Sequence, residues 1–191
     1  MALFTRMYDV MMALAKKEKA PWYLAGLSFA ESSFFPIPPD VMLAPMCLAR
    51  PGFAWRYALL TTVASVIGGL LGYLLGYFAF EMIQSVMISA GYESAYLHAK
   101  QWFSDWGFWA IFLAGFSPIP YKVFTITAGS MAMSLLPFVL ASVIGRGLRF
   151  YLVAGLIVWK GDKMEQILQR YVERIGWAVV AIIVILYLFL V

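Results

Sequence analysis

The chain has 191 residues and a net charge of +4, a length typical of a single domain. Hydrophobic residues make up 63% of it and charged residues only 13%, whereas a soluble domain has about 25% charged residues. This composition excludes a water-soluble globule, and the aromatic content of 17% excludes a disordered chain. One cysteine, Cys47, and one histidine, His98, exclude an intrachain disulfide and a zinc cluster. The sequence therefore predicts an all-α integral membrane protein with no cofactor, metal or nucleic-acid partner.

The N-terminal residues, 1–21, predict an amphipathic surface helix. Their lysines, Lys16, Lys17 and Lys19, follow the amphipathic stretch Met1–Ala15, whereas a cleavable signal places its basic residues first.

Three apolar stretches predict membrane-spanning helices. Tyr57–Phe80 and Leu135–Trp159 both reach the roughly 20 residues that a span requires. Gly176–Val191 is uncharged over 16 residues and would extend about 24 Å as a helix. It predicts a short C-terminal transmembrane helix.

Two further apolar segments, Trp22–Ala49 and Trp106–Met133, are interrupted by proline. The interruptions contain Pro36, Pro38 and Pro39 in the first segment, and Pro118 and Pro120 in the second. Proline removes a backbone donor and clashes with the preceding turn, so neither segment can be one continuous helix. Irregular backbone at membrane depth must face protein or water, and both breaks therefore predict a polar cavity.

The two interrupted segments belong to an internal repeat. Pro36-Ile-Pro-Pro-Asp-Val41 corresponds to Pro118-Ile-Pro-Tyr-Lys-Val123, and Ala64–Gly68 has the same five residues as Ala141–Gly145. We interpret the chain as one membrane domain in six parts: the N-terminal helix 1–21, repeat 1 (22–80), an extracytoplasmic surface segment (81–105), repeat 2 (106–159), a cytoplasmic surface segment (160–175) and a C-terminal transmembrane helix (176–191).

The lysine and arginine distribution bears on orientation. If both interrupted segments are re-entrant hairpins and the N-terminus is cytoplasmic, ten basic residues lie inside and only Lys100 lies outside. If both segments cross the membrane, the ratio becomes 9:2, which does not exclude that arrangement. We favour hairpins, because the acidic residues of 81–105 suit an outside loop. The two repeats then enter from opposite faces, an inverted repeat typical of transporters.

Five ionisable residues fall within apolar segments: Glu31, Asp40, Lys122, Arg146 and Arg149. An unpaired charge costs about 2.5–3.5 kcal/mol at the centre of a membrane helix, so these residues must pair, take up protons or face water. Asp40 and Lys122 occupy equivalent positions of the two repeats and are predicted to approach each other. Arg146 and Arg149 share a helix face, although Arg149 could extend toward the membrane surface. The five charges indicate either a polar binding pocket or structural ion pairs between the hairpins.

Other residues indicate packing. Gly68, Gly72 and Gly76 recur every four residues, which allows another helix to approach closely. Cys47 lies among apolar neighbours, and His98 lies in a polar segment. Since the sequence shows no nucleophile-and-base motif, we expect no enzymatic activity.

These motifs together resemble the DedA family, also called VTT or SNARE-associated proteins. The resemblance covers about residues 22–160 and rests on Glu31 with the first proline motif, the glycine-rich helix Ala64–Gly76, and the run from Gly115-Phe-Ser-Pro118 through Lys122 to Ala128-Gly129. The Pro-Ile-Pro form of both motifs is similar to the YqaA-like branch of the family.

The resemblance implies a bacterial inner-membrane protein with two opposed re-entrant hairpins and a role in lipid transport linked to proton-motive force. It implies a phospholipid such as phosphatidylethanolamine, or undecaprenyl phosphate, as the substrate. The family's acidic residues map onto Glu31 and Asp40. The family usually has two arginines around the second proline motif. Here Gly115 replaces the first of them and Lys122 approximates the second. Arg146 compensates for the missing cation.

The leading hypothesis is therefore a lipid flippase or scramblase. Lys122, Arg146 and Arg149 would bind the phosphate head group, while Glu31 and Asp40 balance the cations and take up a proton when the site empties. The alternatives are a proton-coupled antiporter of a monovalent cation, in which the two carboxylates bind the ion, and a membrane scaffold or assembly factor.

Overall fold

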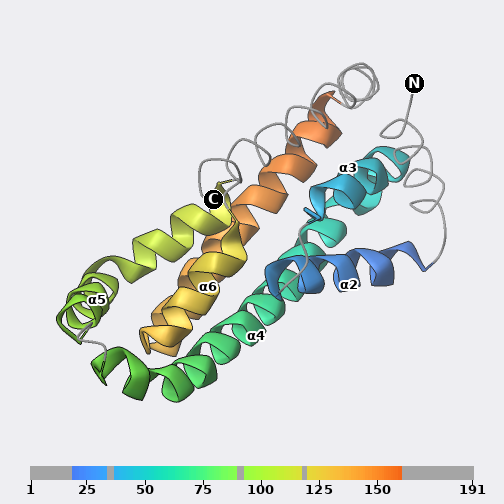
Figure 1. Ribbon diagram of the computed structural model, residues 1–191. Helices are drawn as coiled ribbons and strands as arrows, with labels where there is room; N and C mark the ends of the chain where they lie inside the picture. The colour runs from blue at the N-terminus through green and yellow to red at the C-terminus, as the bar shows by residue number, and fades with distance from the viewer. Residues whose placement is uncertain (1–18, 34–36, 90–92, 118–119, 161–191) are drawn as a thin grey trace, which may run out of the picture.

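The structure is a computed structural model that describes residues 19–33, 37–89, 93–117 and 120–160. Within these ranges all regular structure is helical (Figure 1). The elements are α2 (Ala20–Ser33), α3 (Asp40–Ala49), the short 3-10 turn η1 (Pro51–Phe53), α4 (Ala54–Ser89), α5 (Glu93–Phe116), α6 (Tyr121–Ser130) and a last helix, Leu135–Lys160. The predicted C-terminal span Gly176–Val191 and nearly all of the N-terminal helix lie outside the described residues.

Two helical stretches are long and apolar enough to cross a membrane. Pro51–Phe80 has a mean hydropathy of 1.9 and Leu135–Lys160 one of 1.5. They correspond to the predicted spans Tyr57–Phe80 and Leu135–Trp159. The described residues of the predicted surface segment 81–105 are also helical, because α4 continues to Ser89 and α5 begins at Glu93.

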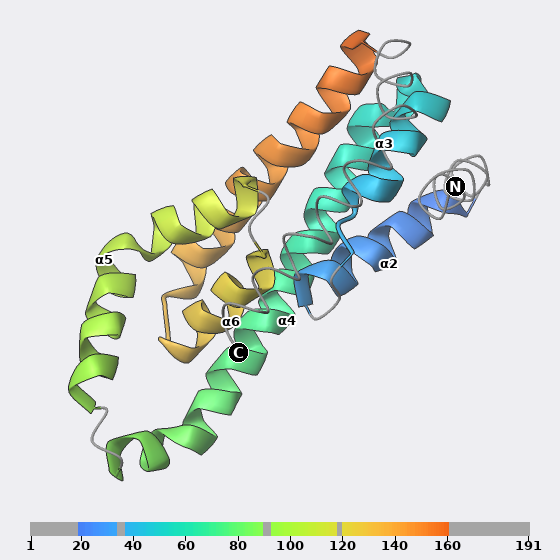
Figure 2. The same cartoon turned by 45° about the horizontal axis from the view of Figure 1, so that its top comes forward.

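Both interrupted segments break at their prolines, as predicted. The first helix of each pair ends before the motif, at Ser33 and Phe116, and the second begins directly after a proline, at Asp40 and Tyr121. A proline immediately before a helix costs little, because the first helical turn has no partner for its N–H groups. In each pair the second helix turns back beside the first (Figure 2).

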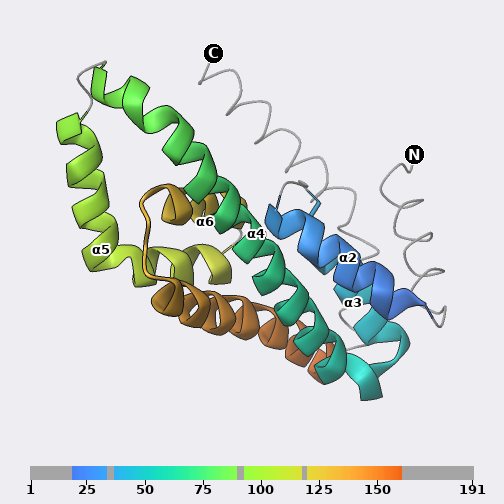
Figure 3. The same cartoon turned by 90° about the horizontal axis from the view of Figure 1, so that it is seen from below.

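The long helix α4 is the centre of the packing, with α2 along its first half and α6 along its second (Figure 3). Glycines make these contacts possible. A Cβ atom at Gly68 would overlap the carbonyl oxygen of Phe29 on α2, and one at Gly76 would overlap that of Ile126 on α6. The close approach predicted from Gly68, Gly72 and Gly76 is confirmed.

The repeated Ala-Ser-Val-Ile-Gly motif makes the same kind of contact in both halves. Gly68 ends the first copy and meets the backbone of Phe29, in the first helix of its hairpin. Gly145 ends the second copy and meets the backbone of Phe112, again in the first helix of its hairpin. The two halves therefore share a packing rule, while their inverted, re-entrant placement in a membrane stays a prediction.

Two buried apolar clusters lie at opposite ends of the helices. One joins the starts of α2 and α4 and the helix α3 to the end of helix Leu135–Lys160, and includes Ala20, Ala54 and Ile157. The other joins α5 and α6 to Tyr73 of α4 and the start of helix Leu135–Lys160. Ser65 and Arg146 lie between the clusters along their own helices, so a polar layer separates two apolar cores.

Glycine substitutions test this packing. Gly76→Ala should lower the free energy of unfolding by about 1–3 kcal/mol, because the added methyl group meets a backbone carbonyl that cannot rotate away. Gly26→Ala on α2 is the matched control: it has nothing within 4 Å and should be neutral or stabilising, since alanine favours helix more than glycine does. Thermal unfolding in detergent measures both variants. Equal melting temperatures for the two would contradict the close contact.

Candidate functional site

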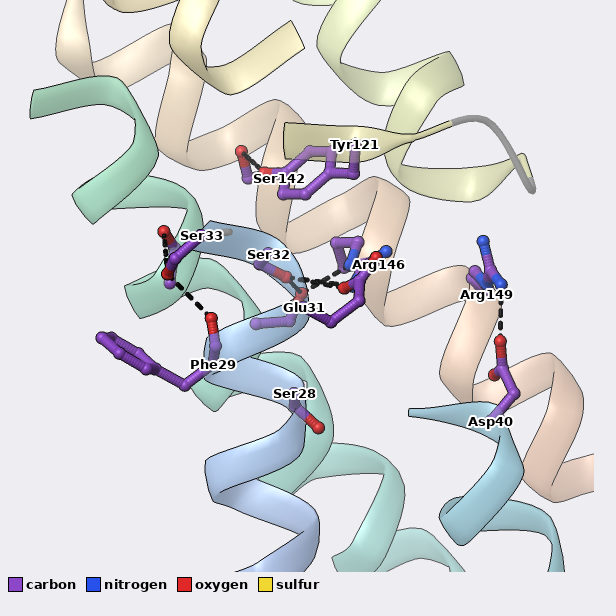
Figure 4. Close-up of polar contacts among 12 residues, drawn as sticks. Ser28, Phe29, Glu31, Ser32, Ser33, Asp40, Tyr121, Ser142, Arg146 and Arg149 are labelled. Atoms are coloured by element: carbon purple, nitrogen blue, oxygen red, sulfur yellow. Dashed lines mark hydrogen bonds and ion pairs between the residues drawn. The ribbon is translucent and has the colours of Figure 1, made fainter. Parts of the chain in front are cut away.

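The centre of the polar layer is the side chain of Arg146, which is 1% exposed on helix Leu135–Lys160. Its Nη2 forms an ion pair with Glu31 Oε2 of α2 and donates to Ser32 Oγ at 3.1 Å. Its Nε donates to Ser65 Oγ of α4 at 2.5 Å. Figure 4 shows Glu31 and Ser32 of α2 beside Arg146. One guanidinium therefore connects the first hairpin, α4 and the second repeat.

Two serine hydroxyls complete the hydrogen bonds around this ion pair. Ser32 Oγ donates to Glu31 Oε2 at 3.0 Å and lies 2.7 Å from Ser65 Oγ. Because each hydroxyl has only one proton, Ser65 must donate to Ser32 when Ser32 donates to the carboxylate. The arrangement satisfies the buried charges, as a low-dielectric environment requires.

Aromatic rings cover the remaining faces of Arg146. Its Cζ atom lies 4.8 Å from the ring centroids of both Tyr121 and Phe150, within the range of cation–π attraction. Tyr121 is itself fully buried, and its hydroxyl donates to Ser142 Oγ at 2.5 Å. Ser65 and Ser142 are the equivalent serines of the repeated motif. Both copies of the motif therefore contribute a hydroxyl to the same layer.

A second ion pair joins the two proline breaks. Arg149 Nη2 lies 2.5 Å from Asp40 Oδ2, and Arg149 Nη1 donates to the carbonyl oxygen of Ser117 at 2.7 Å. Asp40 begins α3 directly after Pro39, and Ser117 is the residue directly before Pro118. The two interruptions, far apart in sequence, therefore meet at one guanidinium.

The Arg149 pair is more open than the Arg146 pair. The exposed fractions are 17% for Arg149 and 26% for Asp40, compared with 1% for Arg146 and 14% for Glu31. Two buried atoms beside it, Asp40 Oδ1 and Ser117 Oγ, have no hydrogen-bond partner among the described residues. Buried polar atoms are normally satisfied, so this pair retains capacity to bind a further polar group.

The structure brings four of the five predicted ionisable residues into two adjacent ion pairs. Sequence reasoning missed the contact between Asp40 and Arg149. Lys122 lies partly buried in the first turn of α6. The serines and Tyr121 were not predicted as site residues. The sequence signal that could have identified Ser65 and Ser142 is their shared position in the repeated motif.

Away from their ends, the outward side chains of the two long helices are apolar. Ile67, Leu148 and Leu136 are exposed by 51%, 50% and 71%. Apolar surface outside and ion pairs inside reverse the distribution in a soluble protein. Together with two helices long and apolar enough to cross a membrane, this distribution is typical of a membrane protein.

Comparison with known proteins identifies the family. Residues 35–159 match the VTT domain, and the chain belongs to the DedA family, whose members are generally transporter-like membrane proteins. It is 48% identical over 190 residues to an uncharacterized protein of Histophilus somni, with full coverage of both chains. An uncharacterized protein of Haemophilus influenzae is 45% identical over 190 residues, covering 100% of this chain and 99% of the relative. An uncharacterized protein of Methanocaldococcus jannaschii is 25% identical over 132 residues, covering 69% of this chain and 78% of the relative. No solved structure matches the chain.

Proposed function

We propose that the protein is a lipid transporter of the bacterial inner membrane, a flippase or scramblase for a phosphate-bearing lipid such as phosphatidylethanolamine or undecaprenyl phosphate. The observation that carries this proposal is the position of Arg149, which binds the residues flanking both proline breaks. A guanidinium held where two broken helices meet, and less buried than its neighbour Arg146, is a suitable anion site.

The proposed topology has two re-entrant hairpins and a cytoplasmic N-terminus. Its support is the apolar cluster that contains Ala20, Ala54 and Ile157. The starts of α2 and α4 both lie in this cluster, as they must if the first hairpin returns the chain to the side from which it entered. Exposed cations gather at that same end, namely Lys19, Arg50, Arg56 and Lys160. The positive-inside rule makes this end cytoplasmic.

In the proposed mechanism, a phosphate group competes with the Asp40 carboxylate for Arg149. Both are anions that a guanidinium can bind in bidentate fashion. The Ser117 hydroxyl, which has no partner in the described part of the chain, can donate to a phosphate oxygen, with Lys122 and Arg146 adding positive charge. The lipid tails remain in the bilayer, where they need no protein cavity. Only the head group has to pass between the hairpins.

Proton coupling follows from the same competition. A carboxylate that gives up its arginine to the phosphate is left without a partner, and proton uptake would remove that unpaired charge. In this proposal the proton is taken up when the head group binds, whereas the sequence-based hypothesis has it taken up when the site empties. Asp40 is the proposed coupling residue, with Glu31 in a supporting role through Arg146.

A liposome assay tests the proposed function. Purified protein should accelerate movement of fluorescent phosphatidylethanolamine or a polyprenyl phosphate between leaflets without moving monovalent cations. An imposed pH gradient should change the rate, and Asp40→Asn should remove that response, because the amide cannot exchange a proton. Lys122→Ala should slow lipid movement.

Three results would contradict the proposal. Cation flux without lipid movement would favour an antiporter. No lipid movement by the wild-type protein, with normal folding of the charge-neutralised variants, would favour a scaffold. A pH response that survives both Asp40→Asn and Glu31→Gln would remove the coupling step.

A further inference from the structure

Exposed aromatic side chains gather at the end of the molecule where α4 begins and helix Leu135–Lys160 ends (Figure 2). Trp55 and Trp159, together with Trp22 at the start of α2, are exposed by 50% or more. Tryptophan concentrates at membrane–water interfaces, because its ring is apolar and its N–H is polar. This end of the molecule is therefore suited to the depth of the lipid head groups.

Trp55 is held in place by the last helix. Its ring stacks on that of Tyr151, with 5.8 Å between the ring centroids. Gly155, one turn further along the same helix, leaves room for the indole, since an added Cβ would lie 3.3 Å from Trp55 Cη2. The exposed indole that precedes Arg56 in the chain therefore has a fixed position.

Arg56, an exposed residue in the first turn of α4, is oriented without using its hydrogen-bond donors. Its Cζ atom lies 5.4 Å from the ring centroid of Phe53. Phe53 is itself fixed, because its N–H donates to the carbonyl oxygen of Arg50 at 3.0 Å and its ring stacks with that of Tyr57. Contact with a ring face leaves the N–H groups of a guanidinium available. Arg56 forms no ion pair with a carboxylate of the described residues, so these donors can bind an anion.

An apolar stripe continues from Arg56 along the outside of α4. Leu59, Val63 and Ile67 follow at spacings of three, four and four residues, which places them on the same helix face as Arg56. Each of the three is about half exposed. From Arg56 to Ile67 the helix rises roughly 16 Å. A cation followed by this length of apolar surface matches a phospholipid, whereas a free phosphate ion would contact the cation alone.

The charges at this end favour an anionic lipid. Lys19, Arg50 and Lys160 are exposed there as well, and all are basic. The acidic residues in the described part of the chain belong to the two ion pairs, to the last third of α4 or to α5. Basic residues near a membrane surface attract lipids with a net negative charge more strongly than zwitterionic lipids.

We propose that Arg56 and the stripe Leu59, Val63 and Ile67 bind one anionic phospholipid, with the phosphate on the guanidinium and an acyl chain along the stripe. This lipid stays bound and ties the end of the molecule to the membrane surface; it is not carried between the leaflets. The inference goes beyond the proposed transport and does not depend on it. In the proposed topology this end faces the cytoplasm, where the membrane surface is negatively charged.

Native mass spectrometry of the purified full-length chain tests the site, with phosphatidylglycerol and phosphatidylcholine of equal chain length as probes. The wild-type protein should retain phosphatidylglycerol more tightly. Arg56→Gln should weaken phosphatidylglycerol binding at least about tenfold, because a hydrogen-bonded charge contact is lost, and should change phosphatidylcholine binding little. Leu59→Ser should also weaken phosphatidylglycerol binding. Melting temperatures in detergent without added lipid should stay near that of the wild type.

Two matched substitutions separate a specific site from general surface properties. Lys19→Gln removes an equal charge at the same end, but on α2. Leu136→Ser repeats the polar change of Leu59→Ser at the opposite end of the last helix. Both should leave phosphatidylglycerol binding unchanged. Equal losses in Lys19→Gln and Arg56→Gln, or equal affinity of the wild-type protein for the two lipids, would overturn the proposal.

Inorganic phosphate separates a lipid site from a site for a free anion. Millimolar phosphate should leave phosphatidylglycerol bound, because the ion cannot replace the contacts along the stripe. Complete displacement by phosphate would overturn the lipid assignment. Arg149→Gln, which is expected to stop lipid movement, should bind phosphatidylglycerol as the wild type does, and a parallel loss of binding in that variant would contradict a separate site.

Discussion

Replacing Arg146 by methionine should destabilise the protein by about 3–5 kcal/mol, the largest stability effect that we expect from any single substitution. The variant leaves Glu31 with no cation and removes the donors to Ser32 and Ser65. Breaking a buried ion pair from one side costs this much because the remaining charge has lost its partner without regaining water. Thermal or denaturant unfolding in detergent should show the loss as a lowered midpoint.

The double variant Glu31→Gln with Arg146→Met is the control for this effect. Removing both charges avoids an isolated buried carboxylate, so the double variant should be more stable than Arg146→Met alone. A double-mutant cycle reports the coupling between the two side chains. If the two single substitutions simply add, the ion pair is not what holds α2 to helix Leu135–Lys160.

The second large effect concerns transport. Arg149→Gln should slow lipid movement about 100-fold, because loss of a hydrogen-bonded charge contact is worth about 2–5 kcal/mol and about 1.4 kcal/mol corresponds to a factor of ten. The same variant should unfold at nearly the wild-type temperature, since Arg149 and Asp40 are both partly exposed. Lipid translocation in liposomes, normalised to the amount of folded protein, measures it.

Arg149→Lys distinguishes charge from geometry. Lysine retains the positive charge but lacks the planar fork, so transport should fall between those of wild type and Arg149→Gln. Wild-type rates in both Arg149 variants would exclude this residue from the phosphate site. A large drop in melting temperature for Arg149→Gln would assign it a structural role.

The two ion pairs of the polar layer differ in how tightly their arginines are held. Arg146 has ion-pair, hydroxyl and aromatic partners on all sides, and displacing Glu31 from it would disrupt contacts among three helices. Arg149 has one carboxylate and one carbonyl, beside two atoms that can accept further partners. A site that must bind and release a ligand is drawn from the less constrained of the two.

Much of the fold could be predicted from local chemistry. Proline cannot continue a helix, so the breaks after Ser33 and Phe116 follow directly from the sequence. Apolar runs of about 20 residues set the long helices, and the spacing of Gly68 and Gly76 set where their neighbours approach. The sequence also identified the charges of the two ion pairs, because a charge in an apolar segment stands out whatever its partner.

The partners themselves were decided only by the tertiary structure. Equivalent positions in the two repeats suggested Asp40 with Lys122, yet the structure pairs Asp40 with Arg149, three residues beyond Arg146. Equivalent sequence positions show which residues occupy similar places in the two repeats. Which side chains form ion pairs depends on how the helices of the two repeats pack against each other. Hydroxyl and aromatic partners such as Ser32 and Tyr121 were equally hidden, since nothing local distinguishes a serine that satisfies a buried arginine from one that bonds its own helix.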